Sequence, residues 1–403
     1  MKLFEYQGKA VFQAAGIPVP ESRLVPCTSA SVAVIAGQVA EAVRELTAAS
    51  SSDNKPAGGD TAIVVKAQLD MGGRGKAGLI HVARGPEAAA EAARTIMGKG
   101  YTIPALLVER AVSIDRELYL SISADATSAN FVILASAEGG VDIEDLAKNR
   151  PEAIRRVVVD PFRGLQGYQS RGLAYDLGLS DNVAKQFAAM VEALYRVFRG
   201  KDAELAEINP VFITTSGELI AGDSKLIIDD NSLYRQREFQ LAREQFDSDA
   251  AYEAAVEGIP YLQFDGDISL MCAGAGLATT VFDLVNYGGG AVANYLEFGG
   301  PNYQKAQRAM ELCLKNQSSV ILVVTFGTIA RADVMAQGIV DAMKLLKPDR
   351  PIVTCIRGTN EEEAHETLRA AGLEPLLDTE VAVQRAIDLA AARKGREKKD
   401  GRA

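Results

Sequence analysis

The pattern of hydrophobic and polar positions divides the chain near residue 245 into two parts that differ in how strands and helices follow one another. In the first part, apolar strands are predicted at residues 62–67, 105–108 and 118–123. Apolar residues from Val183 to Phe198 recur at helical spacing and predict a helix. Residues 46–60 are rich in Ala, Ser, Gly and Asn and predict an exposed loop. The first part therefore mixes α and β elements before a polar, charged stretch at 237–251.

Strands and helices alternate in the second part. Strands are predicted at 268–272, 293–296, 320–326 and 352–356, and helical patterns at 305–315 and 332–346. Such alternation is typical of a parallel sheet covered by helices, so the fold class expected for the chain is α/β. The polar end of the chain is expected to fray. The domain boundaries predicted from these patterns are 1–245, 246–392 and a tail at 393–403.

Composition narrows the functional classes. The 403 residues include 43 Lys and Arg against 53 Asp and Glu, a net charge of -10. Such an acidic chain is a poor general nucleic-acid binder, because that function relies on cations neutralising phosphates. No apolar run approaches the roughly 18–20 residues that span a bilayer, and the first residues have no signal-peptide core. The four cysteines lie far apart without a Cys-x-x-Cys pair, which favours reduced thiols and a cytoplasmic location.

A glycine-rich basic turn follows the first predicted strand. Lys66 lies near the end of that strand, and Gly73, Arg74 and Gly75 form the turn with their neighbours. Glycines let the backbone approach a polyphosphate, and Lys and Arg neutralise its charge. The spacing is not that of a P-loop, and a plain surface loop is the alternative. Carboxylates such as Glu109 and Glu117, after or within the next apolar runs, could accept hydrogen bonds from a nucleotide, or could be ordinary surface groups.

A hairpin centred on Ser216 gives a geometric prediction. Residues whose numbers sum to 432 would face each other across it, and Asn209 and Asp223 form such a pair. Directly opposed Cβ atoms lie about 4.5–5.5 Å apart, so both side-chain oxygens could reach one cation. Such hard oxygen ligands suit Mg²⁺ that is also held by substrate phosphates. The strand period places Glu207 on the face of Asn209 and Lys225 on the face of Asp223. The alternative is an ordinary polar hairpin face.

The second part offers two glycine turns at strand ends. Gly274 and Gly276 follow the strand at 268–272, but Thr279 occupies the third position of the dinucleotide-binding fingerprint, which disfavours a cofactor there. Gly327 ends the strand at 320–326 and precedes a predicted helix, an arrangement that presents free N–H groups to an anion. Ligands of open α/β sheets gather at the carboxyl ends of strands. A routine turn is again the alternative.

Together these residues resemble the β subunit of succinate–CoA ligase over nearly the whole chain. The motifs that carry the likeness are, in order, LFEYQGK at 3–9, GIPVP at 16–20, GGRGKAG at 72–78, EGGVDIE at 138–144, EINP at 207–210 and GAGLA at 274–278. The resemblance implies an ATP-grasp domain at 1–245, an α+β fold, followed by a flavodoxin-like, doubly wound parallel-sheet domain at 246–392.

The resemblance also implies site residues. Nucleotide contacts are expected, for ATP or GTP, at Lys66, Gly73, Arg74, Gly75, Glu109, Val112 and Glu117. Asn209 and Asp223 would be the Mg²⁺ ligands, and Glu207 would contact a phosphohistidine on a partner α subunit, which also holds most of the CoA site. The small carboxylic acid would bind at Ala273, Gly327, Thr328, Ile329 and Ala330. Neither His81 nor His365 lies in a glycine-rich loop, and His365, in an acidic helical stretch, is expected to face solvent.

The sequence departs from succinate-specific relatives where the acid binds. Ala273 stands where those relatives carry Asn, Thr328 where they carry Gly, and Pro301 where they carry the third Gly of a turn. The predicted activity is therefore a nucleoside-diphosphate-forming ligase for succinate, malate or another small acid. Two alternatives remain open: a stand-alone ATP-grasp carboxylate–amine ligase, and a non-catalytic regulatory subunit that keeps the fold.

Overall fold

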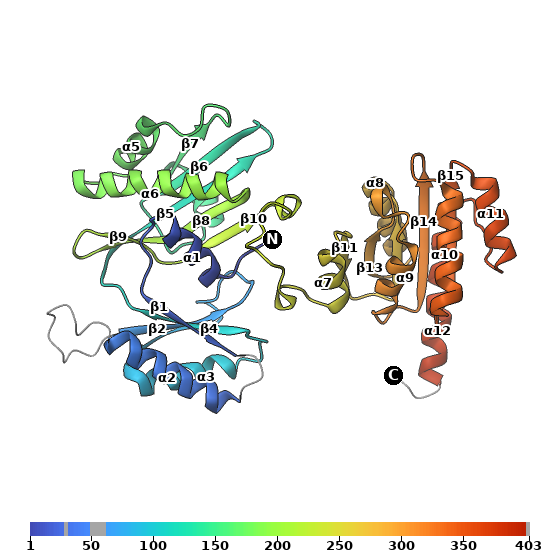
Figure 1. Cartoon of the computed structure of the whole chain (residues 1–403), viewed down its shortest axis with the longest axis horizontal. Helices are drawn as coiled ribbons and strands as arrows, with labels where there is room; N and C mark the ends of the chain where they lie inside the picture. Colours follow the sequence, from blue (N-terminus) through green and yellow to red (C-terminus); the bar gives the residue numbers. More distant parts are fainter. Residues whose placement is uncertain (28–30, 49–61, 400–403) are drawn as a thin grey trace. The chain divides into compact units, whose positions relative to one another are not determined.

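The computed structural model describes residues 1–27, 31–48 and 62–399, which divide into two units, Met1–Gln240 and Leu241–Ala403 (Figure 1). Both units combine helices and sheets, which confirms the α/β class. Most of the loop predicted at 46–60 lies outside the described residues. Its first three residues belong to helix α2, which runs from Val32 to Ala48. In the described part of the chain, no helix is both long and apolar enough to cross a membrane.

The first sheet of the first unit is antiparallel, with the strand order β1-β4-β2-β3. Its strands are β1 (Ser22–Pro26), β2 (Ala62–Gln68), β3 (Ile80–Arg84) and β4 (Ala105–Arg110). Helices α2 and α3 (Gly85–Met97) pack against it and against each other. The buried side of α3 is lined mainly by alanines, such as Ala89 and Ala93. Small side chains on this face allow α2 and α3 to pack against each other.

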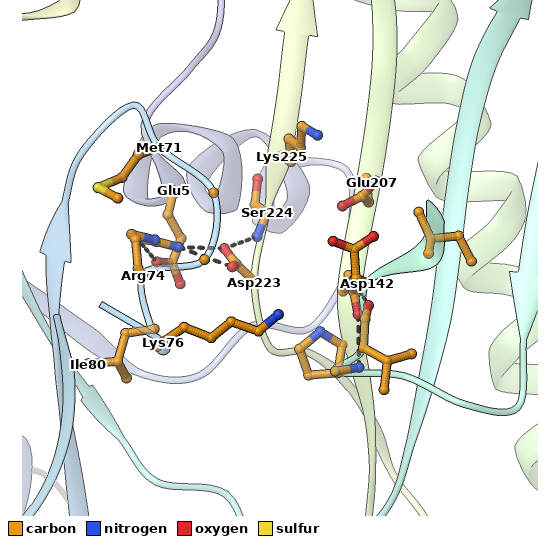
Figure 2. A pocket seen from close by; sticks show the side chains of 18 of the residues that line it. Glu5, Met71, Arg74, Lys76, Ile80, Asp142, Glu207, Asp223, Ser224 and Lys225 are labelled. Atoms are coloured by element: carbon orange, nitrogen blue, oxygen red, sulfur yellow. Dashed lines mark hydrogen bonds and ion pairs between the residues drawn. The ribbon is translucent and has the colours of Figure 1, made fainter. Parts of the chain in front are cut away.

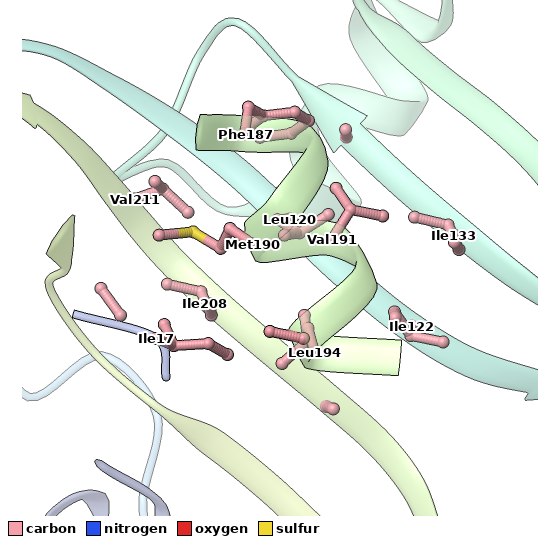
Figure 3. Packing of buried hydrophobic residues seen from close by; sticks show 14 of the residues in the cluster. Ile17, Leu120, Ile122, Ile133, Phe187, Met190, Val191, Leu194, Ile208 and Val211 are labelled. Atoms are coloured by element: carbon pink, nitrogen blue, oxygen red, sulfur yellow. The ribbon is translucent and has the colours of Figure 1, made fainter. Parts of the chain in front are cut away.

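The second sheet of the first unit has the order β10-β8-β5-β6-β7, and β9 also pairs with β8. The strands are β5 (Ile114–Asp125), β6 (Asn130–Ser136), β7 (Ile154–Val159), β8 (Ala203–Thr214), β9 (Leu219–Ala221) and β10 (Lys225–Ile228). The helices of this part are α1 (Glu5–Ala14), α4 (Ile143–Asn149), α5 (Gly167–Asp176) and α6 (Asp181–Gly200). Phe187, Val191 and Leu194 of α6 pack onto the strands (Figure 3), which is the face that their helical spacing predicts.

The hairpin register predicted around Ser216 is confirmed. Val211 faces Ala221, and further out Glu207 faces Lys225, so each pair sums to 432. Gly217 adopts a φ of +80° in the turn, which glycine reaches without strain. Residues 222–224 lie between β9 and β10 opposite Asn209 and Pro210, and the Gly222 N–H donates to the Pro210 carbonyl at 2.9 Å. The register therefore brings Asn209 and Asp223 to the same level of the hairpin.

The second unit has the sheet order β11-β13-β12-β14-β15. Strands β12 to β15 are parallel to one another, and β11 pairs antiparallel with β13. The strands are β11 (Tyr261–Gln263), β12 (Ile268–Cys272), β13 (Val292–Glu297), β14 (Val320–Gly327) and β15 (Ile352–Gly358). The helices are α7 (Asp249–Val256), α8 (Ala275–Tyr287), α9 (Ala306–Leu314), α10 (Ala332–Leu346), α11 (Glu361–Ala370) and α12 (Thr379–Lys399). Separate hydrophobic clusters pack α9 and α10, and α8 and α12, against the strands, as in a doubly wound fold.

Two expectations for the end of the chain were wrong. The polar tail predicted at 393–403 is helical through Lys399, because its Ala, Arg, Lys and Glu residues favour helix even without apolar periodicity. His365 does not face solvent: it is 7% exposed, and its Nε2 lies 3.1 Å from the Ile356 carbonyl oxygen. It shares the buried face of α11 with Ala364 and Leu368, whose packing on the sheet sets the rotation of the helix.

Candidate functional site

A cavity of about 500 Å³ opens in the first unit (Figure 2). Its walls come from the N-terminal segment, the glycine turn, the loop at 140–144 and the polar face of the hairpin. Six of the residues predicted for nucleotide, metal or phosphohistidine line it: Gly73, Arg74, Gly75, Glu207, Asn209 and Asp223. The turn and the hairpin are more than 130 residues apart in the sequence, so the fold has brought together two motifs that were found separately.

Charged side chains gather at one end of this cavity. We call the ion cluster the set Glu5, Lys9, Lys66, Arg74, Glu109 and Asp223. Both lysine Nζ atoms contact the two glutamates: Lys66 lies 2.8 Å from Glu5 and 2.5 Å from Glu109, and Lys9 lies 2.7 Å and 2.5 Å from them. Both lysines also donate to the carbonyl oxygen of Gly222 at 2.9 Å. The cluster thus joins helix α1, sheet strands β2 and β4, and the turn before β10.

Arg74 completes the ion cluster. Its Nη1 lies 2.7 Å from Glu5 Oε2 and donates to the Ala67 carbonyl at 3.0 Å, while its Nη2 lies 3.0 Å from Asp223 Oδ2 (Figure 2). The side chain of Glu5 is only 1% exposed, whereas that of Asp223 is 33% exposed. Arg74 therefore bridges a fully buried carboxylate and one at the cavity wall.

The pKa values follow from this arrangement. Burial by itself would raise the pKa of Glu5, but the charges of Lys66, Lys9 and Arg74 hold it well below its ordinary value. Burial opposes the charged form of Lys66, yet Glu5 and Glu109 raise its pKa. Burial and the negative charge of Glu5 raise the pKa of Asp223 in spite of Arg74. Of the carboxylates, Asp223 is thus the one that would gain from another cation.

Two further acceptors stand on the hairpin face. Asn209 Oδ1 accepts from the Gly140 N–H at 2.9 Å, and its Nδ2 donates to the Val141 carbonyl, so the loop at 140–144 orients the amide. Glu207 accepts from the Tyr119 hydroxyl at 3.0 Å. Burial raises the pKa of Glu207, although Lys225 and the Tyr119 hydrogen bond oppose the shift.

The chemistry of these donors fits a magnesium ion. Asn209 and Asp223 both line the cavity and offer oxygen, the ligand atom that Mg²⁺ prefers. Asp223 Oδ1 already accepts from both Arg74 and the Ser224 N–H, whereas Asn209 Oδ1 and Asp223 Oδ2 each accept one described hydrogen bond and keep a lone pair for a further contact. Within the described ranges, no three His, Cys, Asp or Glu side chains are grouped as an all-protein metal site. A cation shared with substrate phosphates is the kind of site that two protein ligands can support.

The other predicted nucleotide residues lie outside the set that lines the cavity. Lys66 and Glu109 are buried behind it in the ion cluster. Glu117, on β5, touches the loop at 140–144: a Cβ placed on Gly140 would lie 2.2 Å from Glu117 Oε2. Val112 lies between β4 and β5 and is half-buried. Their nucleotide contacts stay predictions.

Sequence reasoning gave no role to Glu5 and Lys9, both part of the ion cluster. They are four residues apart in α1, which is the spacing of a helical ion pair and was the available signal. Nothing local indicates that their other partners lie on β2, β4 and the turn at Gly222.

In the second unit, the predicted acid-binding residues lie where β12 and β14 end. Ala273 follows β12, and the next residue, Gly274, has a φ of +91° and donates its N–H to Glu297 Oε1 at 3.0 Å. A Cβ on Gly299 would lie 2.9 Å from the Ala273 Cβ, so the turns after β12 and β13 are in contact. Position 299 therefore has no room for a side chain, because a Cβ there would meet both Ala273 and Glu297.

The loop after β14 is held by the loop after β15. Thr359 donates its N–H to Gly327 O and its hydroxyl to Thr328 O, both at 2.9 Å. Ile329 is 93% exposed and Thr328 is also exposed, directly before α10. The backbone of this loop is thus fixed while the side chains of Thr328 and Ile329 are exposed. The first residue of α10, Ala332, is buried and donates its N–H to Thr359 O at 2.9 Å, so the anion site expected at this helix start stays a prediction.

Comparisons with known proteins agree with this architecture. Residues 2–213 match the family described as ATP-grasp domain, and residues 271–389 match the family described as CoA-ligase. The chain is 55% identical to the ADP-forming sulfoacetate-CoA ligase subunit SauC of Bilophila wadsworthia over 98% of this chain and 100% of the relative. It is 40% identical to the ADP-forming succinate–CoA ligase subunit beta of Ignicoccus hospitalis over 97% of this chain and 100% of that protein.

Among solved structures, ATP citrate lyase from Methanothrix soehngenii in complex with citrate and coenzyme A has the same fold. Its TM-score is 0.72 at 19% identity, over 97% of this chain and 99% of that one. The matched families fall on the two units that the structure separates, and the relatives match from end to end. The chain therefore belongs to the family of β subunits of nucleoside-diphosphate-forming acid–CoA ligases.

Proposed function

We propose that this chain is the β subunit of an ADP-forming ligase that joins sulfoacetate to CoA. The observation that carries the choice of acid is the end-to-end identity of 55% with a sulfoacetate-CoA ligase subunit, against 40% with a succinate–CoA ligase subunit. Malate and succinate, expected from the sequence alone, are the competing acids. A carbon–sulfur bond forms in each case, and ATP is converted to ADP and phosphate.

The first unit would phosphorylate a histidine on a partner α subunit. Lys66 and Arg74 supply positive charge for the polyphosphate, and the N–H groups of the glycine turn can approach it. Asn209 and Asp223 would hold Mg²⁺, which supplies charge neutralisation at the transferred phosphoryl group. Glu207, oriented by Tyr119, would accept a hydrogen bond from the partner's imidazole N–H and hold the ring toward the cavity.

The second unit would help to hold the acid and the phosphohistidine. The acid carboxylate takes the phosphoryl group from the histidine, and the CoA thiol then displaces phosphate to form the thioester. The partner subunit would bind most of the CoA. The positive end of the α10 helix dipole, and the fixed loop before it, suit the negative charge of the phosphoryl group.

The side chains that differ from succinate-specific relatives suit a sulfonate. Sulfoacetate has one methylene between its two acid groups where succinate has two, and its sulfonate carries three oxygens. Thr328 offers an exposed hydroxyl donor that glycine lacks. Ala273 removes an amide that would otherwise bond the second carboxylate, at about 1.5–3 kcal/mol for a bond to a charged group. The site is therefore expected to disfavour succinate and to accept a shorter, more strongly hydrogen-bonding acid.

The test is kcat/KM for sulfoacetate, succinate and malate with the chain co-purified with its partner and Mg·ATP. We expect sulfoacetate to be preferred by tenfold or more. The double variant Ala273→Asn, Thr328→Gly should shift the ratio toward succinate, while Val34→Ala, an exposed change in the other unit, should leave it unchanged. A wild-type preference for succinate would overturn the choice of acid. Ligation by this chain without a partner would overturn the subunit assignment.

A further inference from the structure

Arg74 is shared by two carboxylates that differ in burial. Its Nη1 stays with Glu5 Oε2 at 2.7 Å, and its Nη2 lies 3.1 Å and 3.0 Å from Asp223 Oδ1 and Oδ2. Both oxygens of Asp223 are therefore engaged by a single nitrogen of Arg74. A cation bound at Asp223 would have to share or displace that nitrogen, because two positive charges on one carboxylate repel each other.

We propose that Glu5 is a positioning residue. It keeps Arg74 in place when Asp223 binds the Mg²⁺ ion of the nucleotide. The inference rests on the proposed function only in that it requires a nucleotide with Mg²⁺ in this cavity. Arg74 would keep its Nη1 contacts with Glu5 and Ala67 O and turn Nη2 from Asp223 toward phosphate oxygens. The acid that the second unit uses has no part in this exchange.

Glu5 and Asp223 differ in burial, and this difference gives Glu5 the permanent contact with Arg74 and Asp223 the exchangeable one. Glu5 borders the cavity, but its side chain is only 1% exposed and its carboxylate is enclosed by Lys9, Lys66 and Arg74. Asp223 reaches the cavity wall and is 33% exposed. An arginine with one permanent and one exchangeable carboxylate can change partners without being left unpaired and buried.

The backbone around Glu5, at the start of helix α1, is anchored firmly enough to hold the Glu5 carboxylate in place for Arg74. The N–H of Leu3 donates to Leu226 O of β10 at 2.9 Å, and the N–H of Tyr6 donates to the Gln68 side-chain oxygen at 3.0 Å. Gly8 packs against Ser224, where a Cβ would lie 2.0 Å from the serine hydroxyl oxygen. The backbone around Glu5 is thus held by the strand that precedes the glycine turn and by the strand that follows Asp223.

The experiment compares nucleotide binding with and without metal. Calorimetric titration of the co-purified complex with ADP, in Mg²⁺ and in excess EDTA, gives two dissociation constants, and their ratio measures the metal's contribution. In Glu5→Gln, Arg74 loses its fixed anion and moves wholly to Asp223. We expect the metal's contribution to fall tenfold or more, with metal-free affinity within threefold of wild type.

Glu109→Gln is the matched control. Glu109 is equally buried and contacts Lys9 and Lys66, whereas the contacts described for Arg74 do not include it. Its loss should weaken both affinities alike and leave their ratio unchanged. Because Glu5→Gln leaves an excess positive charge that could unfold the protein, the double variant Glu5→Gln, Lys9→Gln restores the balance and should show the same fall in ratio.

Two outcomes overturn the inference. One is a wild-type ratio in a folded Glu5→Gln variant or in the double variant. The other is an equal fall in Glu109→Gln, which would mean that any loss of charge in the ion cluster has the same effect. Failure of the wild-type complex to bind Mg·ADP would instead refute the proposed function, so the two failures are distinguishable.

Discussion

Replacing Gly358 with alanine tests the structure of the loops where we propose that the acid binds. Gly358 ends β15 with a φ of +113°, and a Cβ there would lie 1.9 Å from the carbonyl oxygen of Gly327. That oxygen also accepts the N–H of Thr359 at 2.9 Å. The added methyl group therefore meets the backbone of Gly327, and the hydrogen bond that holds the two loops together must lengthen or break.

The expected loss of stability has three sources. The backbone conformation is unfavourable for an L-residue by about 1–3 kcal/mol. The steric overlap costs about 1–3 kcal/mol. The weakened hydrogen bond costs about 0.5–1.5 kcal/mol. A total of about 3–7 kcal/mol corresponds to a fall of roughly 6–28 °C in the melting temperature of a unit of this size, at about 2–4 °C per kcal/mol.

Gly372→Ala is the matched control, because Gly372 also has a positive φ, +81°, but none of the described atoms lies within 4 Å of a Cβ placed there. The Gly372→Ala variant should lose only about 1–2 kcal/mol of unfolding free energy. Scanning calorimetry of the full chain measures the melting temperatures of both variants. Added Mg·ADP raises the transition temperature of the nucleotide-binding unit, so the transition that does not move belongs to the second unit. Equal shifts for the two variants would refute the argument from the Gly327 contact.

Three other changes test the first unit. Tyr119→Phe removes the hydrogen bond that stabilises the Glu207 carboxylate, so the pKa of Glu207 should rise further and the acid limb of the pH–rate profile should move to higher pH; a shift to lower pH contradicts this. Asp223→Asn should reduce partner phosphorylation by orders of magnitude, while Arg74 keeps Glu5 and stability falls by at most about 3 kcal/mol in a urea titration; near-normal turnover removes the metal assignment. Phe187→Ala empties a fully buried site between α6 and the sheet and should cost about 3–5 kcal/mol of unfolding free energy, without changing the KM for ATP of the folded fraction.

Local features of the sequence predicted the parts of the site that depend on neighbouring residues. The turn at Ser216 sets the pairing of Glu207 with Lys225 several residues away, because a hairpin passes its register along both strands. The four parallel strands of the second unit were predicted because each is a short apolar run next to a glycine turn, whereas the three-residue strand β11 was not predicted. The hydrogen bonds that fix the loop at Thr328 could not be predicted, since they come from Thr359, in the loop after a different strand.

The ion cluster could not be predicted because its partners are distant in sequence. The contact between Lys9 and Glu109 spans 100 residues, and no periodicity relates the two positions. His365 was misplaced for a related reason: three glutamates precede it, but the rotation of α11 is decided by how Ala364 and Leu368 pack on the sheet. Patterns within one element predict its type, whereas the side it buries depends on the elements around it.

The pairing of the first residues with β10 has a consequence for synthesis on the ribosome. The carbonyl oxygen of Gly222 accepts hydrogen bonds from Lys9 and Lys66, and Gly222 follows Lys9 by 213 residues in the sequence. At about 5–20 residues per second, α1 emerges roughly 10–40 s before the turn that completes its surroundings. Within helix α1, Glu5 and Lys9 are each other's only partner in the ion cluster, and all its other members come from later parts of the chain. We therefore expect the nascent first unit to become resistant to protease late, after β10 has left the exit tunnel, and helix α1 to be the last of its elements to dock.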